Sequence, residues 1–225
     1  MKSLVPFLLW ASIAQAQEAV QTDGALSDND FYRLVSCAAP VAAPCQKDVI
    51  RWSPADAVDV SVGIVQIDEG YPPNLIIAVN TALNVAIADV NAADAELHLT
   101  RSEDTENPDI GIYLLDLVEG DAISGTGRVP LDGAILQAAK AQVWWRDDFS
   151  IITTAIVFGR DISFADLPSV MLEEITQANG LLTDIDGKYY EARSIFSETS
   201  NQRTTLGIQD IMALRRHYPK NAIRP

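Results

Sequence analysis

Residues 59–67, DVSVGIVQI, open the regular hydrophobic patterning of the chain, with apolar and polar side chains in alternation. Alternation with a period of two is typical of a strand with one buried face, so a strand is predicted there. Residues 75–91, LIIAVNTALNVAIADVN, are rich in Leu, Ile, Ala and Val and contain neither Gly nor Pro. That composition over this length predicts a largely buried helix.

The rest of the chain carries shorter patterns of the same two kinds. The predicted strands are residues 95–100, 109–116, 140–148 and 150–160, and the predicted helices are residues 167–180 and 207–217. A Gly-rich loop is expected at 119–133, and a tight turn near Asp147 and Asp148 joins the last two strands. One α+β domain, with a mixed sheet and helices packed on it, accounts for these elements.

The N-terminus, MKSLVPFLLWASIAQAQEA, has the organisation of a secretory signal peptide. Lys2 precedes an apolar run from Leu4 to Ala14, and Ala14 and Ala16 supply the small residues that signal peptidase needs. This run is too short to span a bilayer, and no later stretch is expected to reach about 18 apolar residues. The predicted division is a signal peptide (1–16), a flexible leader (17–28) and a single folded domain (29–225). The mature protein is expected to be periplasmic or secreted, without membrane insertion.

Cys37 and Cys45 are the only cysteines, in the segment CAAPVAAPC. In an oxidising compartment such a pair predicts a local disulfide, because redox-active and zinc-binding cysteines need closer spacing or more ligands.

The formal net charge of −15 limits which partners the protein can bind. It repels nucleic acid phosphates and anionic lipid surfaces, so no nucleic acid partner is expected. The remaining partner class is an unidentified envelope or extracellular ligand.

The predicted helix at 167–180 carries a polar strip beside its buried face. At 100° per residue its apolar side chains form one stripe, made of Leu167, Val170, Met171, Ile175 and Ala178. Glu174 falls inside this stripe, and Glu173 and Gln177 fall at its edge. A carboxylate there is costly unless it is hydrogen-bonded or lies in a polar cleft.

Three interpretations of this strip are open. It can be an internal hydrogen-bonded network that keeps the fold together. It can line a cleft that binds a peptide, glycan or envelope component without cleaving it. It can also support hydrolysis, with Glu174 as the base and Glu173 as an acid or stabiliser, although adjacent helix positions diverge by about 100° and rarely converge on one bond.

Residues 171–181, MLEEITQANGL, resemble the zinc helix of a metzincin of the matrixin kind, H-E-x-x-H-x-x-G-x-x-H. In this alignment Glu173, Gln177 and Thr183 stand at the three histidine positions. Glu174 stands at the general-base glutamate, and Gly180 at the glycine. The resemblance implies a zincin-like mixed sheet with a long buried helix, an active-site-type helix and a C-terminal helix.

Two later segments extend the resemblance. Residues 194–196, SIF, resemble the Met-turn with Phe196 in place of methionine, and residues 206–219 resemble the closing helix. The chain is identified as a member of a bacterial family of exported proteins of unknown function. The segments that carry this resemblance are the D-F-Y start, the cysteine loop followed by R-W, the E-E-x-x-Q helix, R-S-I-F and L-R-R-H-Y-P.

The metal ligands of the metzincin pattern are replaced. His98 and His217 are the only histidines, and neither is four residues from a useful ligand. A set of Glu, Gln and Thr offers one good oxygen donor and two weak ones, whereas catalytic zinc prefers imidazole. Without zinc nothing lowers the pKa of a bound water, so Glu174 has no activated nucleophile to deprotonate. No metal, cofactor or peptidase activity is therefore expected.

The predicted function is a non-catalytic, pseudopeptidase-like binding or structural domain. The alternative is a metal-independent hydrolase that uses Glu174 with Glu173. Asp184 takes the third ligand position if the turn after Gly180 is shifted by one residue. The residues expected to line the cleft are Glu173, Glu174, Gln177, Thr183 and Asp184.

Overall fold

A computed structural model describes residues 19–103 and 107–220. The predicted signal peptide lies outside these residues. In chain order the elements are β1 (Val20–Gln21), α1 (Asp28–Cys37), β2 (Val60–Ile67), α2 (Pro73–Ala92), β3 (Leu99–Arg101), β4 (Ile110–Leu114), β5 (Ala139–Trp145), β6 (Ile151–Phe158), α3 (Leu167–Gln177), β7 (Ile185–Asp186) and α4 (Ile208–His217). Every strand and helix predicted from periodicity is present. Strand β3 differs most from its prediction, because it begins at Leu99 whereas the strand was predicted to begin at residue 95.

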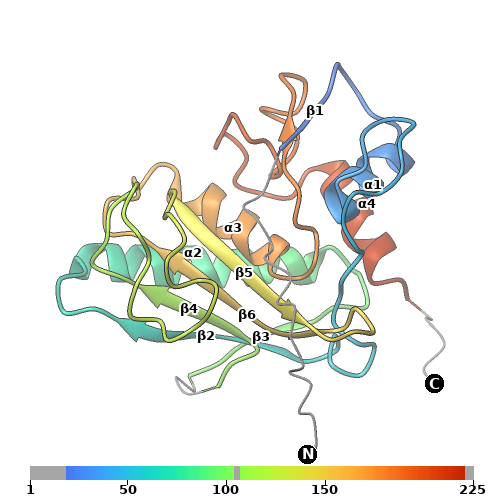
Figure 1. Ribbon diagram of the computed structural model, residues 1–225. Coiled ribbons are helices and arrows are strands. Elements are labelled where there is room, and N and C mark those ends of the chain that lie inside the picture. The colour runs from blue at the N-terminus through green and yellow to red at the C-terminus, as the bar shows by residue number, and fades with distance from the viewer. Residues whose placement is uncertain (1–18, 104–106, 221–225) are drawn as a thin grey trace, which may run out of the picture.

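The main sheet is mixed and has the order β3-β2-β4-β6-β5. Its first four strands are parallel, and β5 runs antiparallel to β6 along one edge. Figure 1 shows α2 and α3 together on one side of this sheet, with α1 and α4 paired beside it. A second, two-stranded sheet pairs β1 with β7 in parallel. The predicted α+β class with a mixed sheet is confirmed.

Alternation along the central strands divides the core into two clusters. Ile112 of β4 and Ile156 of β6 face α2 and α3 in the main cluster. The next residues along the strands, Tyr113 and Val157, face the opposite side and pack under the loop after β4. The second face of the sheet is therefore covered by a loop, which is the predicted Gly-rich segment.

Only one face of α2 is buried. Val79 and Leu83 are fully buried against the sheet, whereas Ile77 is 70% exposed and Val85 is 53% exposed. The helix is long and apolar enough to cross a membrane by length and composition, and it alone meets that criterion within residues 19–103 and 107–220. No apolar stretch long enough to cross a membrane was predicted after the N-terminus. Length and hydropathy alone do not separate a core helix from a spanning one.

Two residues of the predicted leader (17–28) pair with the rest of the fold. Val20–Gln21 forms β1, in which the N–H of Val20 donates to the carbonyl of Asp184 at 2.9 Å. Main-chain pairing of this kind leaves no periodic pattern in the sequence. Helix α1 was also missed. Ser27 caps it by accepting the N–H of Asp30, and Phe31 and Leu34 supply its buried face.

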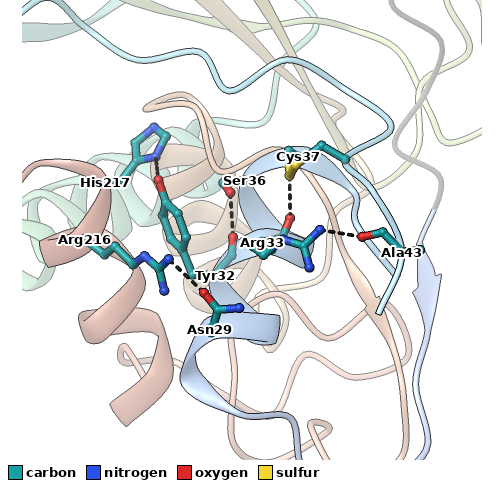
Figure 2. The surroundings of a disulfide bond; sticks show 9 residues. Asn29, Tyr32, Arg33, Ser36, Cys37, Ala43, Arg216 and His217 are labelled. Carbon is teal, nitrogen blue, oxygen red and sulfur yellow. Dashed lines mark hydrogen bonds between the residues drawn. A yellow bond between two sulfur atoms is a disulfide. The ribbon is translucent and has the colours of Figure 1, made fainter. Parts of the chain in front are cut away.

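The predicted disulfide between Cys37 and Cys45 is confirmed. It closes a short loop at the end of α1, and the guanidinium of Arg33 donates to the carbonyl of Ala43 across that loop. A loop of this length is worth about 2.5 kcal/mol in the chain-entropy account of disulfides. Figure 2 shows the same helix joined to α4 through Tyr32, whose hydroxyl lies 3.3 Å from Nδ1 of His217. A disulfide is compatible with an oxidising compartment.

Helix α3 ends at Gln177, three residues before the predicted end. The chain then reverses at Gly180, which has a φ of 95°. A Cβ atom at this position would lie 2.0 Å from the carbonyl oxygen of Ile50. Both the backbone conformation and the available space therefore require glycine here.

Candidate functional site

The polar strip of α3 lies against β5 and against the segment that follows Gly180. Glu174 reaches β5, where one of its carboxyl oxygens accepts the backbone N–H of Ala141. Gln177 reaches the other side and donates from Nε2 to Oδ1 of Asp184 at 2.7 Å. Glu173 donates its carboxyl proton to Asp184 as well. Helix α3, strand β5 and the segment after Gly180 thus meet at these side chains. We call Glu173, Glu174, Gln177, Thr183 and Asp184 the α3 cluster.

Glu174 is held as a neutral acid. Its side chain is 6% exposed, and burial raises its pKa from 4.5 to about 8. The negative charge of Asp184 raises the pKa further, while the charge of Lys140 and the N–H of Ala141 lower it. At pH 7 a group with this pKa is ionised in only about one molecule in ten.

Asp184 and Glu173 share one proton. Burial raises the pKa of Asp184 to about 7, and the negative charge of Glu198 adds to the shift. Hydrogen bonds from Glu173 and Gln177 lower the pKa of Asp184. The pKa of Glu173 is raised well above its ordinary value, first by burial and then by the charge of Asp184. The two carboxyls therefore titrate as a pair, and burial favours their protonated forms.

Three buried polar atoms of the α3 cluster have no hydrogen-bond partner: Oε2 of Glu174, Oε1 of Gln177 and Oγ1 of Thr183. Gln177 is 1% exposed and Thr183 is fully buried. Unpaired buried acceptors are costly, and native proteins hold few of them. The cluster is therefore polar and enclosed, but its hydrogen bonding is incomplete.

Of the two residues predicted at the turn after Gly180, Asp184 is the one whose side chain meets α3. Asp184 contacts Gln177, whereas Thr183 makes a backbone hydrogen bond to the carbonyl of Val35. In the described residues no group of three or more His, Cys, Asp or Glu side chains is arranged to hold a metal ion.

The segment at residues 194–196 lies next to the α3 cluster. Phe196 is fully buried, and its carbonyl accepts the N–H of Ile185 at 2.7 Å, one residue after Asp184. Asp210 of α4 fixes this segment by accepting the hydroxyl of Ser194 at 2.6 Å. Burial raises the pKa of Asp210, and the hydrogen bonds that it accepts lower it. Helix α4 thus holds in place the segment at 194–196, which lies next to the α3 cluster.

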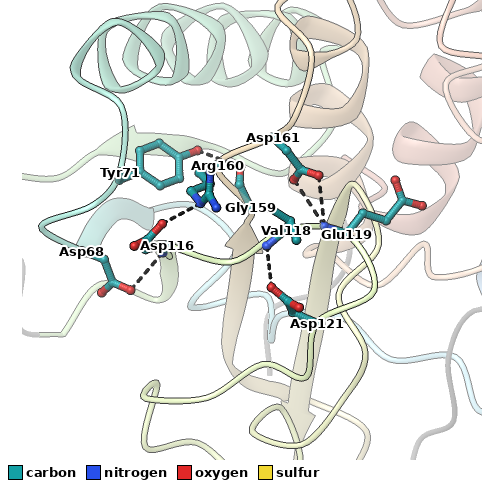
Figure 3. Close-up of polar contacts among 9 residues, drawn as sticks. All are labelled: Asp68, Tyr71, Asp116, Val118, Glu119, Asp121, Gly159, Arg160 and Asp161. Atoms are coloured by element: carbon teal, nitrogen blue, oxygen red, sulfur yellow. Dashed lines mark hydrogen bonds and ion pairs between the residues drawn. The ribbon is translucent and has the colours of Figure 1, made fainter.

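A second group of carboxylates follows the ends of β2, β4 and β6 and is drawn in Figure 3. These side chains have structural partners. Asp68 accepts the N–H of Asp116, which itself pairs with Arg160 at 2.6 Å. Asp161 accepts the N–H of Glu119. The group stabilises loops and offers no set of free oxygen ligands.

Lys140, Glu198 and the backbone of Ala141 also act on the cluster and were not predicted from the sequence. Lys140 is 9% exposed, and its charge acts on Glu174. Its position on an edge strand follows from the strand order, which the sequence does not reveal. Glu198 comes two residues after the SIF segment, and that proximity was an available indication.

No protein-family model matches the chain, and no curated protein matches its sequence.

Proposed function

We propose that this chain is an exported, non-catalytic binding protein on a degenerate metzincin scaffold, and that its ligand is an extended peptide added to the outer edge of β5. The observation that carries the proposal is that β5 is the last strand of the sheet and that α3 places Glu174 against Ala141 of this strand. The α3 cluster therefore borders an edge strand.

The scaffold part of the proposal has several supports. The order strand, long helix, strands and polar helix is the order that the resemblance implies. Gly180 makes the reversal that the glycine of the metzincin pattern makes, and α4 supports the segment at 194–196. The disulfide is compatible with export.

The state of Glu174 favours a non-catalytic role. A general base must be ionised and must reach the proton it removes. Glu174 is 6% exposed, and its pKa of about 8 leaves it mostly protonated at neutral pH. The histidine positions, at Glu173, Gln177 and either Thr183 or Asp184, contain no imidazole.

Strand β5 offers main-chain groups to a ligand. In an antiparallel strand, alternate residues turn both polar groups to the same side. By this alternation Ala139 and Val143 share the side of Ala141, where Glu174 takes the N–H of Ala141 and where Ala139 and Val143 are 5% and 3% exposed. The open part of the edge is therefore at Gln142 to Trp145, which line a pocket. No strand in the described part of the chain pairs with this edge. Such an edge is a template for an added peptide strand.

The alternative function is metal-independent hydrolysis by Glu174 with Glu173. The observation that favours it is the raised pKa of both carboxyls, since perturbed acids often occur at catalytic sites. Burial opposes it, because a substrate must displace β5 or the segment at Asp184 to reach Glu174.

Selection from a display library of random peptides of about ten residues tests the proposal on the processed, exported protein. The best peptide is then resynthesised with N-methyl groups on alternate residues, in two complementary sets. One set blocks the N–H groups that face β5 and should abolish binding. The other set blocks the groups that face solvent and should leave binding within about twofold.

Two results would contradict the proposal. One is a library that yields no peptide above background, and the other is equal binding by both methylated sets. Mass spectrometry of the peptide after incubation addresses the alternative. Cleavage that survives a chelator and disappears in Glu174→Gln would favour the hydrolase over the binding protein.

A further inference from the structure

A pocket of about 440 Å³ opens beside the C-terminal end of β5, on the β5–β6 hairpin. The segment after the disulfide forms its second wall. Arg51 bridges Ser150 of the hairpin, and the N–H of Ile151 donates to the carbonyl of Arg51 at 2.8 Å. The lining residues are Asp48, Pro130, Gln142, Val143, Trp144, Trp145, Arg146, Asp147 and Phe149.

The lining combines aromatic residues with two carboxylates. Trp144, Trp145 and Phe149 are among the lining residues; the two tryptophans lie on opposite faces of β5, and Phe149 is 44% exposed. The carboxylates of Asp48 and Asp147 accept no hydrogen bond from any residue between 19 and 103 or between 107 and 220. The one cation in the lining, Arg146, is partly engaged, since its guanidinium donates to Ser150 at 3.3 Å.

Aromatic faces with nearby carboxylates attract cations. One of these rings already does so, because the guanidinium of Arg128 lies 5.6 Å from the ring centre of Trp144. The backbone of Phe149 adds a second feature, a φ of 65°. This φ belongs to the hairpin turn, in which the N–H of Phe149 donates to the carbonyl of Arg146 at 2.9 Å.

We propose that this pocket binds the guanidinium or ammonium group of a basic side chain, and that it selects basic residues in a peptide aligned along β5. This inference rests on the proposed function, since the pocket is lined by Gln142 and Val143 of the same edge strand. The net charge of −15 acts in the same direction, because it attracts cationic ligands and repels anionic ones.

The test isolates the pocket from the strand edge with a small probe. N-acetyl-arginine amide is titrated into the processed protein, and N-acetyl-citrulline amide serves as its uncharged counterpart. Indole N–H resonances in NMR spectra report binding. Trp144 and Trp145 should shift with the arginine probe, and added salt should weaken the shift. Trp52, whose indole donates to Asn179 inside the core, is the internal reference.

The variant Asp48→Asn with Asp147→Asn should weaken binding of the arginine probe by about fivefold to tenfold. Asp23→Asn with Glu69→Gln removes the same charge from exposed positions outside the pocket and should change binding less than about twofold. Equal binding of the arginine and citrulline probes would overturn the inference. So would equal weakening by the two double variants.

The outcome separates this inference from the proposed function. If selected peptides show the alternate N-methyl pattern but no preference for Arg or Lys, the pocket assignment is wrong and peptide binding at β5 stands. If the arginine probe shifts Trp144 and Trp145 while the library yields no peptide, the pocket assignment holds and the edge-strand function is wrong.

Discussion

Two buried polar networks flank the end of α3, and they differ in how completely their hydrogen bonds are made. On one side is the α3 cluster of Glu173, Glu174, Gln177, Thr183 and Asp184, with three unpaired atoms and raised carboxyl pKa values. On the other side is a network around α4, formed by Tyr32, Trp52, Asn179, His217 and Tyr218.

The α4 network pairs every side-chain polar atom that it buries. The indole of Trp52 donates to Asn179 at 2.8 Å, and Tyr218 donates to the carbonyl of Asn179 at 2.7 Å. His217 lies 2.9 Å from the carbonyl of Ile50 through Nε2 and accepts from Tyr32 through Nδ1. Burial lowers the pKa of His217 to about 4, so the ring is neutral and fully bonded.

Because of this difference in hydrogen bonding, we attribute a structural role to the α4 network and propose a binding role for the α3 cluster. Complete pairing makes a buried network a source of specificity and rigidity. Incomplete pairing in the α3 cluster costs stability and calls for another explanation, which is its position beside the edge strand β5. Proteins retain such costs mainly at functional sites.

The largest expected effect breaks the complete network. Asn179→Ala removes the acceptor of the Trp52 indole and the donor to the carbonyl of Ile175. Leaving these groups unpaired should lower the free energy of unfolding by about 3 kcal/mol at any pH between about 6 and 9. Chemical denaturation measures it. Asn84→Ala on the exposed face of α2 is the control and should change stability by less than about 0.5 kcal/mol. A loss below 1 kcal/mol (about one weak hydrogen bond) for Asn179→Ala would contradict the structural role.

The second effect concerns the pH dependence of the α3 cluster. The folded pKa of Glu174, about 8, lies above its ordinary value of 4.5, so its contribution to stability is full below pH 4.5 and is lost as pH rises through 8. His217 acts oppositely, with stability present above 6.5 and lost as pH falls through 4. Above pH 6.5 only the carboxyls should therefore change stability.

From about pH 6.5 to 9 the protein should lose unfolding free energy, and Glu174 alone should account for about 2 kcal/mol of the loss. Glu174→Gln keeps the shape of the neutral acid and should remove about 2 kcal/mol of it, leaving the part due to Glu173 and Asp184. Glu69→Gln, at an exposed position, should leave the slope unchanged. Parallel slopes for Glu174→Gln and the unmodified protein would show that Glu174 does not titrate in this window.

The smallest effect tests the metzincin geometry of the strip. Glu173→His, Gln177→His and Asp184→His together should create a three-imidazole zinc site, because Gln177 and Asp184 already touch. Zinc at about ten times its Kd should then stabilise the folded protein by about 1.4 kcal/mol. The companion variant with Thr183→His in place of Asp184→His should respond less. A folded triple variant that zinc does not stabilise in calorimetry would remove this support for the resemblance.

Most of the fold was predictable because its core elements carry periodic patterns. The alternation in β2 and the apolar run of α2 each specify one element locally. Helix α1 was missed although Ser27 and the spacing of Phe31, Leu34 and Val35 indicated it. Strand β1 could not be predicted, since two residues of main-chain pairing with β7 leave no side-chain pattern.

The candidate site was predictable only in part. Helical periodicity brings Glu173, Glu174 and Gln177 onto one strip, and that much follows from the sequence. Their surroundings depend on long-range packing. The proximity of Ala141 has no local signature, because strand order decides it. The protonation of the carboxyls follows from that burial.

The most direct test of the account is a titration of the Glu174 carboxyl by carbon-13 NMR, with Glu174→Gln used to assign the resonance. Burial raises the pKa of Glu174 to about 8, so the carboxyl is mostly neutral at pH 7, and the proposed binding role rests on that state. The account predicts a midpoint near pH 8. A midpoint at or below the ordinary 4.5 would mean an ionised, solvated carboxylate at neutral pH and would contradict the account.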